Sequence, residues 1–408
     1  MLERVKSTDK LAGLLTVRGG TPPERFEFFV KEGIHEFHRC VNRLECSYSP
    51  WIFQILIDEG CNQNCIHCFF GPRERWQTPS HETTYQIGIA IAKQGYFPDA
   101  YPTEPLMSKK SLLNFSTFML SSKTPFVTNG TAPLARRSAR WLYRKLKNLK
   151  IRKVYISLHG ANPETHDFLT QTPGSFETAL ETLGKLGKMA QIHGQMQLGL
   201  NVVVHRENIT ELPGIFKLAA ENNVSMIFII KLIKPPFSQI PSNWEMNRQA
   251  TGDALLEISK LRLSYRNRIY VELAPSWGLN FHTSGIWRYL YGGGINYCPI
   301  GLRFAVHPGR REIYPCMTTV GAPEAKCGQL IGDTYRVQFN SEARLLMHFH
   351  KDWNSKAYGS CAPENCPYSV LCHGACRATA LASHTLGTPS ALFAPFPDCI
   401  TPLLEELS

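Results

Sequence analysis

The apolar run Trp51-Ile-Phe-Gln-Ile-Leu-Ile57 is followed almost at once by Cys61-Asn-Gln-Asn-Cys65-Ile-His-Cys68. The run predicts a buried strand, and the three cysteines after it have the spacing C-x3-C-x2-C. Three thiolates this close in sequence can bind one face of an iron-sulfur cube, which leaves one iron open to a small molecule. A zinc site or unrelated buried thiols are the alternatives, but zinc usually takes a fourth protein ligand. The triplet therefore favours a cluster with an open iron.

This spacing resembles that of the radical S-adenosylmethionine (SAM) enzymes. The resemblance implies a 4Fe-4S cluster on Cys61, Cys65 and Cys68 whose open iron is chelated by the amino and carboxylate groups of SAM. An electron from the cluster then splits the sulfonium and releases a 5′-deoxyadenosyl radical. His67 occupies the family's aromatic position before the third cysteine, where a ring can pack on adenine. A histidine that only packs locally is the other interpretation.

Length and composition are those of a folded protein of two or three domains, with 408 residues and 43% hydrophobic residues. Its 13 cysteines are unevenly placed, since none lies between Cys68 and Cys298, and this favours metal sites over a disulfide scaffold. The start of the chain has no apolar signal core and no run of about 18 apolar residues occurs, so we expect a cytoplasmic protein without a membrane segment. The net charge of +11 suits either an acidic partner or a solvated basic surface.

Apolar runs and amphipathic segments alternate after the cysteine triplet. Strands are predicted at 124–128, 153–158, 197–204 and 225–230, and helices at 135–149, 175–193 and 209–222. This alternation implies about six parallel strands with right-handed crossovers. We therefore expect an α/β fold with a partial (β/α)6 TIM-like radical SAM barrel. Ligands collect at the carboxyl ends of such strands, which is where the triplet lies.

Two further segments resemble the family at these strand ends. Tyr101-Pro-Thr-Glu-Pro-Leu106 resembles the Gly-Gly-Glu segment after the second strand, with Pro102-Thr103 in place of the glycines. The resemblance implies that Glu104 accepts a charge-assisted hydrogen bond from the SAM amino group, while an ordinary proline-rich turn is the alternative. Thr128-Asn-Gly-Thr131 resembles the turn after the third strand and implies that Asn129 reaches the cofactor, although alone it is only a turn.

The fourth and fifth predicted strands carry the remaining cofactor candidates. Ser157-Leu-His-Gly160 resembles the Ser-Leu-Asp-Gly of the family, which makes Ser157 a candidate, and Asn201 is a further polar candidate. His159 replaces the usual aspartate. Thr170 stands where relatives often carry an arginine that pairs with the SAM carboxylate. Either that carboxylate is bound differently here or the alignment is shifted.

Composition divides the chain into four parts. We expect an N-terminal extension at 1–50, a core barrel at 51–235, a bridging region at 236–297 and a cysteine-rich domain at 298–408. The extension includes a predicted amphipathic helix at 26–40, and Cys40 and Cys46 are interpreted as packing thiols. The bridge includes a predicted helix at 250–264 and a strand at 269–273.

Eight cysteines lie in the last part: Cys298, Cys316, Cys327, Cys361, Cys366, Cys372, Cys376 and Cys399. Their number matches the ligand demand of two further four-iron clusters. Residues 298–316 predict a hairpin that presents Cys298 and Cys316 at its two ends. The spacing from Cys361 to Cys376 is C-x4-C-x5-C-x3-C, similar to the SPASM extension of peptide-modifying radical SAM enzymes, whose first gap is usually x2.

The SPASM resemblance implies how these cysteines divide between two auxiliary clusters. Cys361, Cys366, Cys372 and Cys399 would bind a distal cluster, and Cys298, Cys316 and Cys376 a nearer one. Relatives often have one more cysteine before the position of Cys298, and this chain has none there. The nearer cluster is then either closed by Cys327 or open at one iron. A pair of zinc sites is the alternative for the whole block.

The resemblance implies a SPASM-group radical SAM enzyme that abstracts hydrogen from a peptide or protein substrate, with a ribosomal precursor peptide foremost. It also implies an electron donor such as flavodoxin or ferredoxin, and the short 1–50 segment leaves room for a separate leader-recognition protein. The alternatives are a dehydrogenase or epimerase of a small molecule and a metal-binding adaptor. The adaptor leaves the Glu104 segment unexplained, and nucleic acid is not expected because the basic segment 136–147 is interpreted as a helix with a solvated face.

Overall fold

The computed structural model describes residues 52–57, 60–68, 70, 80–94, 96–118, 126–233, 240–277, 300, 303–341, 343, 365 and 376. The N-terminal extension lies outside these residues. So do the following cysteines: Cys40, Cys46, Cys298, Cys361, Cys366, Cys372 and Cys399. What the sequence predicts for them stays a prediction.

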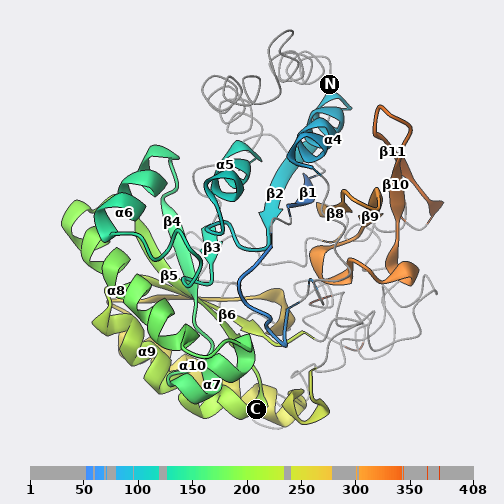
Figure 1. The fold of residues 1–408 in the computed structure, drawn as a ribbon. Helices are drawn as coiled ribbons and strands as arrows, with labels where there is room; N and C mark the ends of the chain where they lie inside the picture. Colours follow the sequence, from blue (N-terminus) through green and yellow to red (C-terminus); the bar gives the residue numbers. More distant parts are fainter. Residues whose placement is uncertain are drawn as a thin grey trace.

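Parallel strands form the framework in two sheets (Figure 1). One sheet has the order β3-β4-β5-β6-β7, and in the other β1 lies between β2 and β8. The strands of this framework are β1 (Ile52–Ile57), β2 (Phe97–Pro102), β3 (Phe126–Thr128), β4 (Lys153–Ser157), β5 (Gln197–Val204), β6 (Met226–Lys231), β7 (Tyr270–Leu273) and β8 (Arg303–His307). Neighbours among them within each sheet pair in parallel, so all their carboxyl ends lie at one edge.

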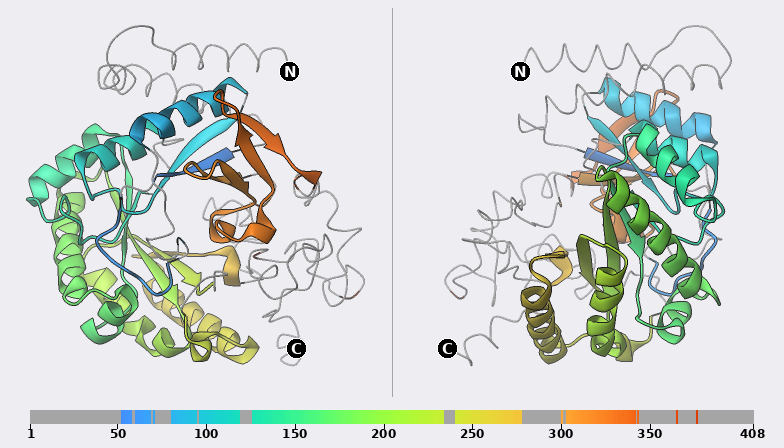
Figure 2. Two further views of the ribbon diagram at one scale, coloured as in Figure 1. Left: turned by 45° about the vertical axis from the view of Figure 1, so that its right-hand side comes forward. Right: turned by 90° about the vertical axis from the view of Figure 1, so that its left-hand side faces the viewer.

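Helices connect the strands and lie on the outside of the curved sheets, as the left view of Figure 2 shows. They are α4 (His81–Lys93), α5 (Lys109–Phe118), α6 (Ala139–Asn148), α7 (Pro163–Thr170), α8 (Ser175–His193), α9 (Leu212–Glu221) and α10 (Arg248–Tyr265). Short 3-10 turns are η3 (Arg206–Glu211), η4 (Ser242–Trp244), η5 (Pro275–Trp277), η6 (Met317–Thr319) and η7 (Pro323–Ala325). The curved, incomplete barrel agrees with the partial barrel that the alternation predicts. None of the helices in the described ranges is both long and apolar enough to span a membrane.

Local features of the chain explain where two helices depart from their predicted bounds. Helix α6 begins at Ala139 rather than 135 because the Ser138 hydroxyl accepts a hydrogen bond from the Trp141 backbone N–H at 3.4 Å. Helix α9 begins at Leu212 rather than 209 because η3 precedes it and a proline occupies its first turn. Strands β1 and β5 and helix α8 lie where the sequence predicts them.

The main apolar core fills the space between the helices and strands β3 to β7. Its largest fully buried side chains include Phe126, Phe216 and Trp277. Close packing extends to backbone contacts, since a Cβ at Gly187 in α8 would lie 2.1 Å from the Asn222 carbonyl oxygen at the end of α9. Only a residue without a side chain fits where these two helices meet.

We therefore expect Gly187→Ala to destabilise the protein by about 1–3 kcal/mol, even though alanine is the better helix former by about 1 kcal/mol. The matched control is Gly184→Ala on the same helix, where the added Cβ would meet the Asn222 side-chain oxygen at 3.2 Å. That oxygen belongs to a side chain, which can give by a few tenths of an ångström. Chemical denaturation measures both variants, and equal stabilities would show that the α8 to α9 contact is not tight.

Beyond the barrel, the chain forms antiparallel hairpins next to β1. Strand β8 pairs with β9 (Glu312–Tyr314), which confirms the hairpin predicted within residues 298–316. Strands β10 (Gly328–Ile331) and β11 (Arg336–Phe339) extend the same sheet, drawn in orange in Figure 1. Because β8 also pairs in parallel with β1, this part is joined to the barrel by backbone hydrogen bonds. Strand β7, from the expected bridging region, likewise extends the barrel sheet. The domain boundaries themselves stay a prediction.

Candidate functional site

The cysteine triplet lies in a loop that follows the carboxyl end of β1. Gly60, with φ of +89°, starts this loop in a conformation that side chains rarely adopt. The Cys68 backbone N–H donates to the Cys65 carbonyl at 3.1 Å, which closes a tight turn around the last two cysteines. None of the three thiols forms a disulfide within the described residues, and all three are partly exposed. The sulfurs are therefore available to a ligand at the strand-end edge of the barrel.

Backbone hydrogen bonds attach this cysteine loop, residues 60–68, to helix α7. The Asn64 backbone N–H donates to the Thr170 carbonyl at 3.2 Å, and the Ile66 N–H donates to the Leu169 carbonyl at 3.0 Å. Thr170 is the position where the family resemblance led us to expect an arginine. Its hydroxyl shares a 2.7 Å hydrogen bond with the Ser175 hydroxyl. Thr170 thus helps to position the loop instead of presenting a charge.

Amide side chains tie the other side of the loop to the turn after β3. Asn62 and Gln63 both donate to the Thr131 hydroxyl, at 2.8 and 3.2 Å. Asn129 donates to the Asn62 side-chain oxygen at 2.9 Å and to the Cys61 sulfur at 3.5 Å. The predicted candidate Asn129 therefore lies against the first cysteine of the loop.

Hydrogen bonds to sulfur show that the loop suits a cluster ligand. Besides Asn129, the Gln63 backbone N–H points at the Cys61 sulfur at 3.5 Å. Donors of this kind stabilise a thiolate and tune a cluster that the thiolate binds. Among the described residues, no three His, Cys, Asp or Glu side chains converge as the ligands of a single metal ion would. A cube binds each thiolate at a different iron, whereas zinc binds all its ligands at one ion.

Glu104 lies after β2, where it connects the ends of β2 and β3. Its carboxylate is 2% exposed and accepts hydrogen bonds from the Thr128 hydroxyl at 2.7 Å, the Asn129 N–H at 2.7 Å and the Leu106 N–H at 2.8 Å. Burial raises the pKa of Glu104 to about 7, against the lowering effect of these three bonds. An ionised carboxylate can accept about four hydrogen bonds, so these three donors leave one acceptor position for a further donor. Glu104 is thus connected to Cys61 through Asn129.

Ser157 and Asn201 are neighbours on adjacent strands. They are paired in register on β4 and β5, so their side chains share one face near the carboxyl ends. Both are partly buried. Within the described part of the chain, no hydrogen bond joins either side chain to the cysteine loop. The fold brings them to the correct edge, and their contact with a cofactor stays a prediction.

A group of four histidines lies behind the loop, and sequence reasoning singled out only two of them. The rings of His67 and His159 meet edge to face at 4.5 Å, and those of His159 and His166 stack at 5.7 Å. The ring of His205 stacks on Trp244 at 4.4 Å. Burial lowers the pKa of His67 to about 3 and that of His166 and His205 to about 4, and charge on His205 or His166 lowers the pKa of His67 further. We call His67, His159, His166 and His205 the histidine cluster.

The chain was compared with known proteins. No protein-family model matches it. Two curated relatives are both named AdoMet-dependent heme synthase. The one from Methanosarcina barkeri is 24% identical over 183 residues, 42% of this chain and 48% of the relative. The one from Nitratidesulfovibrio vulgaris is 26% identical over 259 residues, 58% of this chain and 63% of the relative. The chain therefore spans about half of the first relative and less than two thirds of the second.

Two solved structures share the fold. Streptococcus suis SuiB bound to the precursor peptide SuiA is 12% identical and has a TM-score of 0.58, with 94% of this chain and 82% of that chain covered. The enzyme anSMEcpe with bound AdoMet is 15% identical and has a TM-score of 0.59, with 84% of this chain and 94% of that chain covered. These matches confirm the fold class, a partial TIM-like barrel with a C-terminal SPASM domain. The chain thus shares its fold with SuiB and anSMEcpe, and part of its length is similar to two AdoMet-dependent heme synthases.

The resemblance to the radical SAM enzymes implies a 4Fe-4S cluster and SAM, and the residues present fit both. Cys61, Cys65 and Cys68 form no disulfide among the described residues, and N–H donors point at the Cys61 sulfur. Glu104 is an acceptor at the adjacent strand end. Which residues contact SAM stays a prediction.

We expect Glu104→Gln to weaken SAM binding by about ten- to a hundredfold, because a charge-assisted hydrogen bond is worth about 1.5–3 kcal/mol. The control Glu164→Gln changes an exposed carboxylate at the start of α7. Iron content should persist in both. Because the pKa of Glu104 is raised to about 7, the carboxylate ionises as the pH rises through neutrality. Wild-type affinity should then rise about tenfold from about pH 6 to about pH 8, and the Gln variant should not show this rise.

Anaerobic equilibrium dialysis with labelled SAM measures both effects. Unchanged affinity in Glu104→Gln would show that residues 101–106 are wrongly aligned with the Gly-Gly-Glu segment.

Three of the C-terminal cysteines, Cys316, Cys327 and Cys376, lie among the described residues. Cys316 follows β9, and its thiol contacts the Thr318 hydroxyl at 2.9 Å. Burial raises the pKa of Cys316, and negative charge on Cys376 raises it further. Burial also raises the pKa of Cys327, with a smaller contribution from charge on Cys316. These electrostatic effects require Cys316 to lie near both other thiols, as a shared site would.

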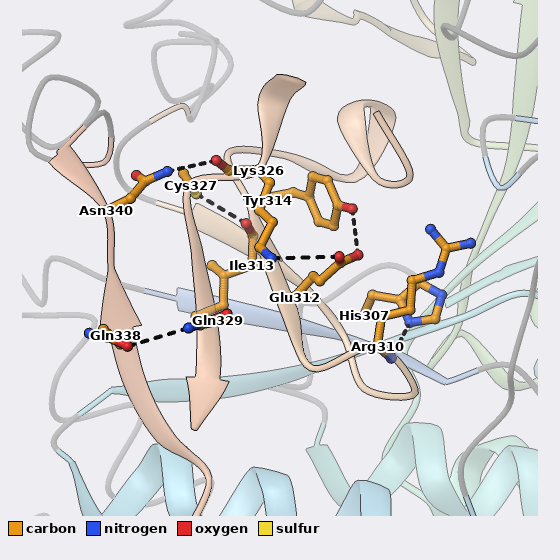
Figure 3. Close-up of polar contacts among 10 residues, drawn as sticks. All are labelled: His307, Arg310, Glu312, Ile313, Tyr314, Lys326, Cys327, Gln329, Gln338 and Asn340. Carbon is orange, nitrogen blue, oxygen red and sulfur yellow. Dashed lines mark hydrogen bonds and ion pairs between the residues drawn. The ribbon is translucent and has the colours of Figure 1, made fainter. Parts of the chain in front are cut away.

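Figure 3 shows the surroundings of Cys327. Its side chain is 1% exposed, and its thiol donates to the Ile313 carbonyl at 3.4 Å. Next to it, Glu312 accepts from the Tyr314 hydroxyl at 2.7 Å and pairs with Lys326 at 3.7 Å. These contacts fix the β9 to β10 connection that carries Cys327. Its role as a cluster ligand stays a prediction.

Proposed function

We propose that this protein cleaves SAM with an electron from a cluster on Cys61, Cys65 and Cys68, and that the resulting radical abstracts hydrogen from a peptide or protein side chain. The observation that carries the proposal is the continuous set of contacts from Cys61 through Asn129 to Glu104. A cluster ligand and an ammonium acceptor are thereby fixed relative to each other at the edge where parallel strands end.

When bound, the cluster supplies the electron that splits the sulfonium and creates a carbon radical. The residues of the chain itself bind and orient SAM. Glu104 accepts the methionyl ammonium, and Asn129 and Gln63 donate to the Cys61 sulfur and so stabilise its thiolate form. Ser157 and Asn201 offer polar groups on the next two strands.

The fold supports a peptide substrate. The solved structures that share this fold include SuiB bound to the precursor peptide SuiA and anSMEcpe with bound AdoMet and a peptide called Kp18Cys. In our proposal two auxiliary clusters accept an electron from the substrate or position it. Cys361, Cys366, Cys372 and Cys399 bind the distal cluster, and Cys298, Cys316, Cys376 and Cys327 bind the nearer one. A flavodoxin or ferredoxin supplies electrons, and a separate protein recognises the leader of the precursor.

A second candidate comes from the curated relatives, which are named as heme synthases. This name favours a tetrapyrrole, a small-molecule substrate of the kind that a radical SAM dehydrogenase would oxidise. The same SAM site would serve both substrates, so the site contacts do not distinguish them.

The experiment that tests the proposal offers both substrates to the reconstituted protein. Synthetic precursor peptides encoded beside the gene and a porphyrin that carries propionate groups are each incubated with SAM and dithionite. Mass spectrometry measures 5′-deoxyadenosine, the mass of the product, and deuterium transferred from labelled peptide into 5′-deoxyadenosine. Transfer from the peptide supports the proposal. Turnover of the porphyrin alone would replace it with the second candidate.

We expect Cys327→Ala to open one iron of the nearer auxiliary cluster, because no other cysteine precedes Cys298 in the place where relatives have an extra ligand. Added 2-mercaptoethanol should then bind this iron and change the electron paramagnetic resonance of the reduced protein. The control Cys46→Ala should show no response to the thiol. If Cys327→Ala is also silent, the nearer cluster is open in the native protein and Cys327 only packs against Ile313.

A further inference from the structure

Backbone hydrogen bonds fix the proton positions in the histidine cluster. The Nδ1 atom of His159 accepts from the Val203 N–H at 3.2 Å, and that of His166 accepts from the His159 N–H at 3.1 Å. The Nδ1 atom of His205 accepts from the Glu207 N–H at 3.3 Å. A ring nitrogen that accepts such a bond has no proton of its own. In a neutral imidazole the proton is then on Nε2, and the pKa of each ring is low enough to keep it neutral.

Two of these Nε2–H groups have nothing to donate to. His166 and His205 are each 1% exposed, and within the described part of the chain their Nε2 atoms have no hydrogen-bond partner. A buried donor without an acceptor is costly, and native proteins rarely keep one without a reason. Two such donors in one cluster next to the cysteine loop indicate that an acceptor atom belongs there.

The proton positions exclude a metal ion as the missing partner. A histidine that binds a metal does so through an unprotonated nitrogen and donates its other N–H to a carbonyl or carboxylate. In His166 and His205 the other nitrogen accepts a backbone N–H, so Nε2 is a donor and has no lone pair to offer. The partner is therefore a hydrogen-bond acceptor such as a carboxylate oxygen.

The position of His166 on α7 supports an anionic acceptor. His166 and Thr170 are one helical turn apart and both are buried, so they lie on the same face of α7. The loop residues Asn64 and Ile66 pack against the end of this helix through the hydrogen bonds to the Thr170 and Leu169 carbonyls. Thr170 itself cannot donate to such an acceptor, because its hydroxyl is hydrogen-bonded to the Ser175 hydroxyl. The His166 imidazole, one turn earlier on the same face of α7, is the hydrogen-bond donor available to an anion.

We propose that His166 and His205 donate through Nε2 to a carboxylate that binds beside the cysteine loop. The carboxylate belongs either to the methionyl part of SAM or to the substrate. His159 is a positioning residue, since its backbone N–H orients the ring of His166 and its own ring contacts His67. The assignment of the carboxylate to SAM rests on the proposed function, whereas the carboxylate site itself does not.

The test uses asparagine and glutamine to separate the two ring nitrogens. Asparagine places an oxygen where Nδ1 lies and has no group at Nε2, and His205 caps η3, where asparagine is a favoured residue. His205→Asn should therefore keep the backbone contact and lose the donor. Glutamine places an amide N–H where Nε2 lies, so His205→Gln should restore binding. His193→Phe changes an exposed histidine on α8 and serves as the control.

One arm compares SAM with decarboxylated SAM by anaerobic dialysis of the reconstituted protein. If the site binds the SAM carboxylate, the wild-type protein should bind SAM about ten- to a hundredfold more tightly than decarboxylated SAM. This affinity ratio should fall toward one in His205→Asn and should not fall in His205→Gln. The second arm adds sodium acetate to protein labelled with [15N]histidine and follows the two Nε2–H resonances. This arm needs no SAM cleavage, so it tests the carboxylate site even when the proposed function is wrong.

Each outcome settles the proposal. A ratio that falls in His205→Asn assigns the carboxylate of SAM. An unchanged ratio together with acetate shifts of the His166 and His205 resonances assigns a substrate carboxylate. An unchanged ratio with no acetate shift overturns the proposal and leaves the two donors to water.

Discussion

The variant in which Cys61, Cys65 and Cys68 are all replaced by alanine is expected to lose about four iron atoms per chain and all cleavage of SAM. The loss is complete because no other cysteine in the described ranges lies in the cysteine loop, and SAM can be split only by an electron delivered at the open iron. Iron analysis and 5′-deoxyadenosine formation with dithionite measure the two effects. The brown colour should weaken without disappearing, because the auxiliary clusters remain.

The control for this variant replaces Cys40 and Cys46, which we interpret as packing thiols. This pair of alanines should keep full iron content and full SAM cleavage. If the triple variant keeps its activity while the control loses it, the cluster ligands have been assigned to the wrong cysteines.

Cys372→Ala is expected to abolish substrate turnover while SAM cleavage with a strong reductant continues. Cys372 is an assigned ligand of the distal auxiliary cluster, so up to four iron atoms should be lost. The Cys61 cluster does not depend on that ligand, which is why 5′-deoxyadenosine should still form. Electron removal from the substrate, or its positioning, would fail.

The measurement for Cys372→Ala is iron content together with two rates, one for 5′-deoxyadenosine and one for modified substrate. Cys327→Ala is the comparison, because it should affect only the nearer cluster. Full iron and full turnover in Cys372→Ala would rule out two auxiliary clusters.

Most of the barrel was predictable from the sequence because parallel strands are buried on both faces and therefore consist of continuous apolar residues. Strand β5 lies at its predicted position for this reason. Helix α8 also lies at its predicted position. Helices α4, α5 and α7 were not predicted, since their mixed composition gives a weak period. The start of α6 was misplaced because a single hydroxyl, that of Ser138, decides it.

The candidate site was predictable at the strand ends and not behind them. The sequence indicated Glu104, Asn129 and the cysteines because each occupies a motif. The donors that fix the loop, Asn62 and Gln63, lie inside the cysteine motif itself, so their presence there was the signal. His166 and His205 come from a helix and a strand end that only the fold brings together. A histidine at the end of β5 could have been noticed, since other strand ends already carried polar candidates.

Electron paramagnetic resonance of the anaerobically reconstituted wild-type protein, reduced with dithionite, tests the central claim most directly. Spectra are recorded with and without SAM, and 5′-deoxyadenosine is measured in the same samples. The account predicts a reduced four-iron signal that changes on addition of SAM, followed by formation of 5′-deoxyadenosine. Stoichiometric zinc, no brown chromophore and no 5′-deoxyadenosine would contradict it.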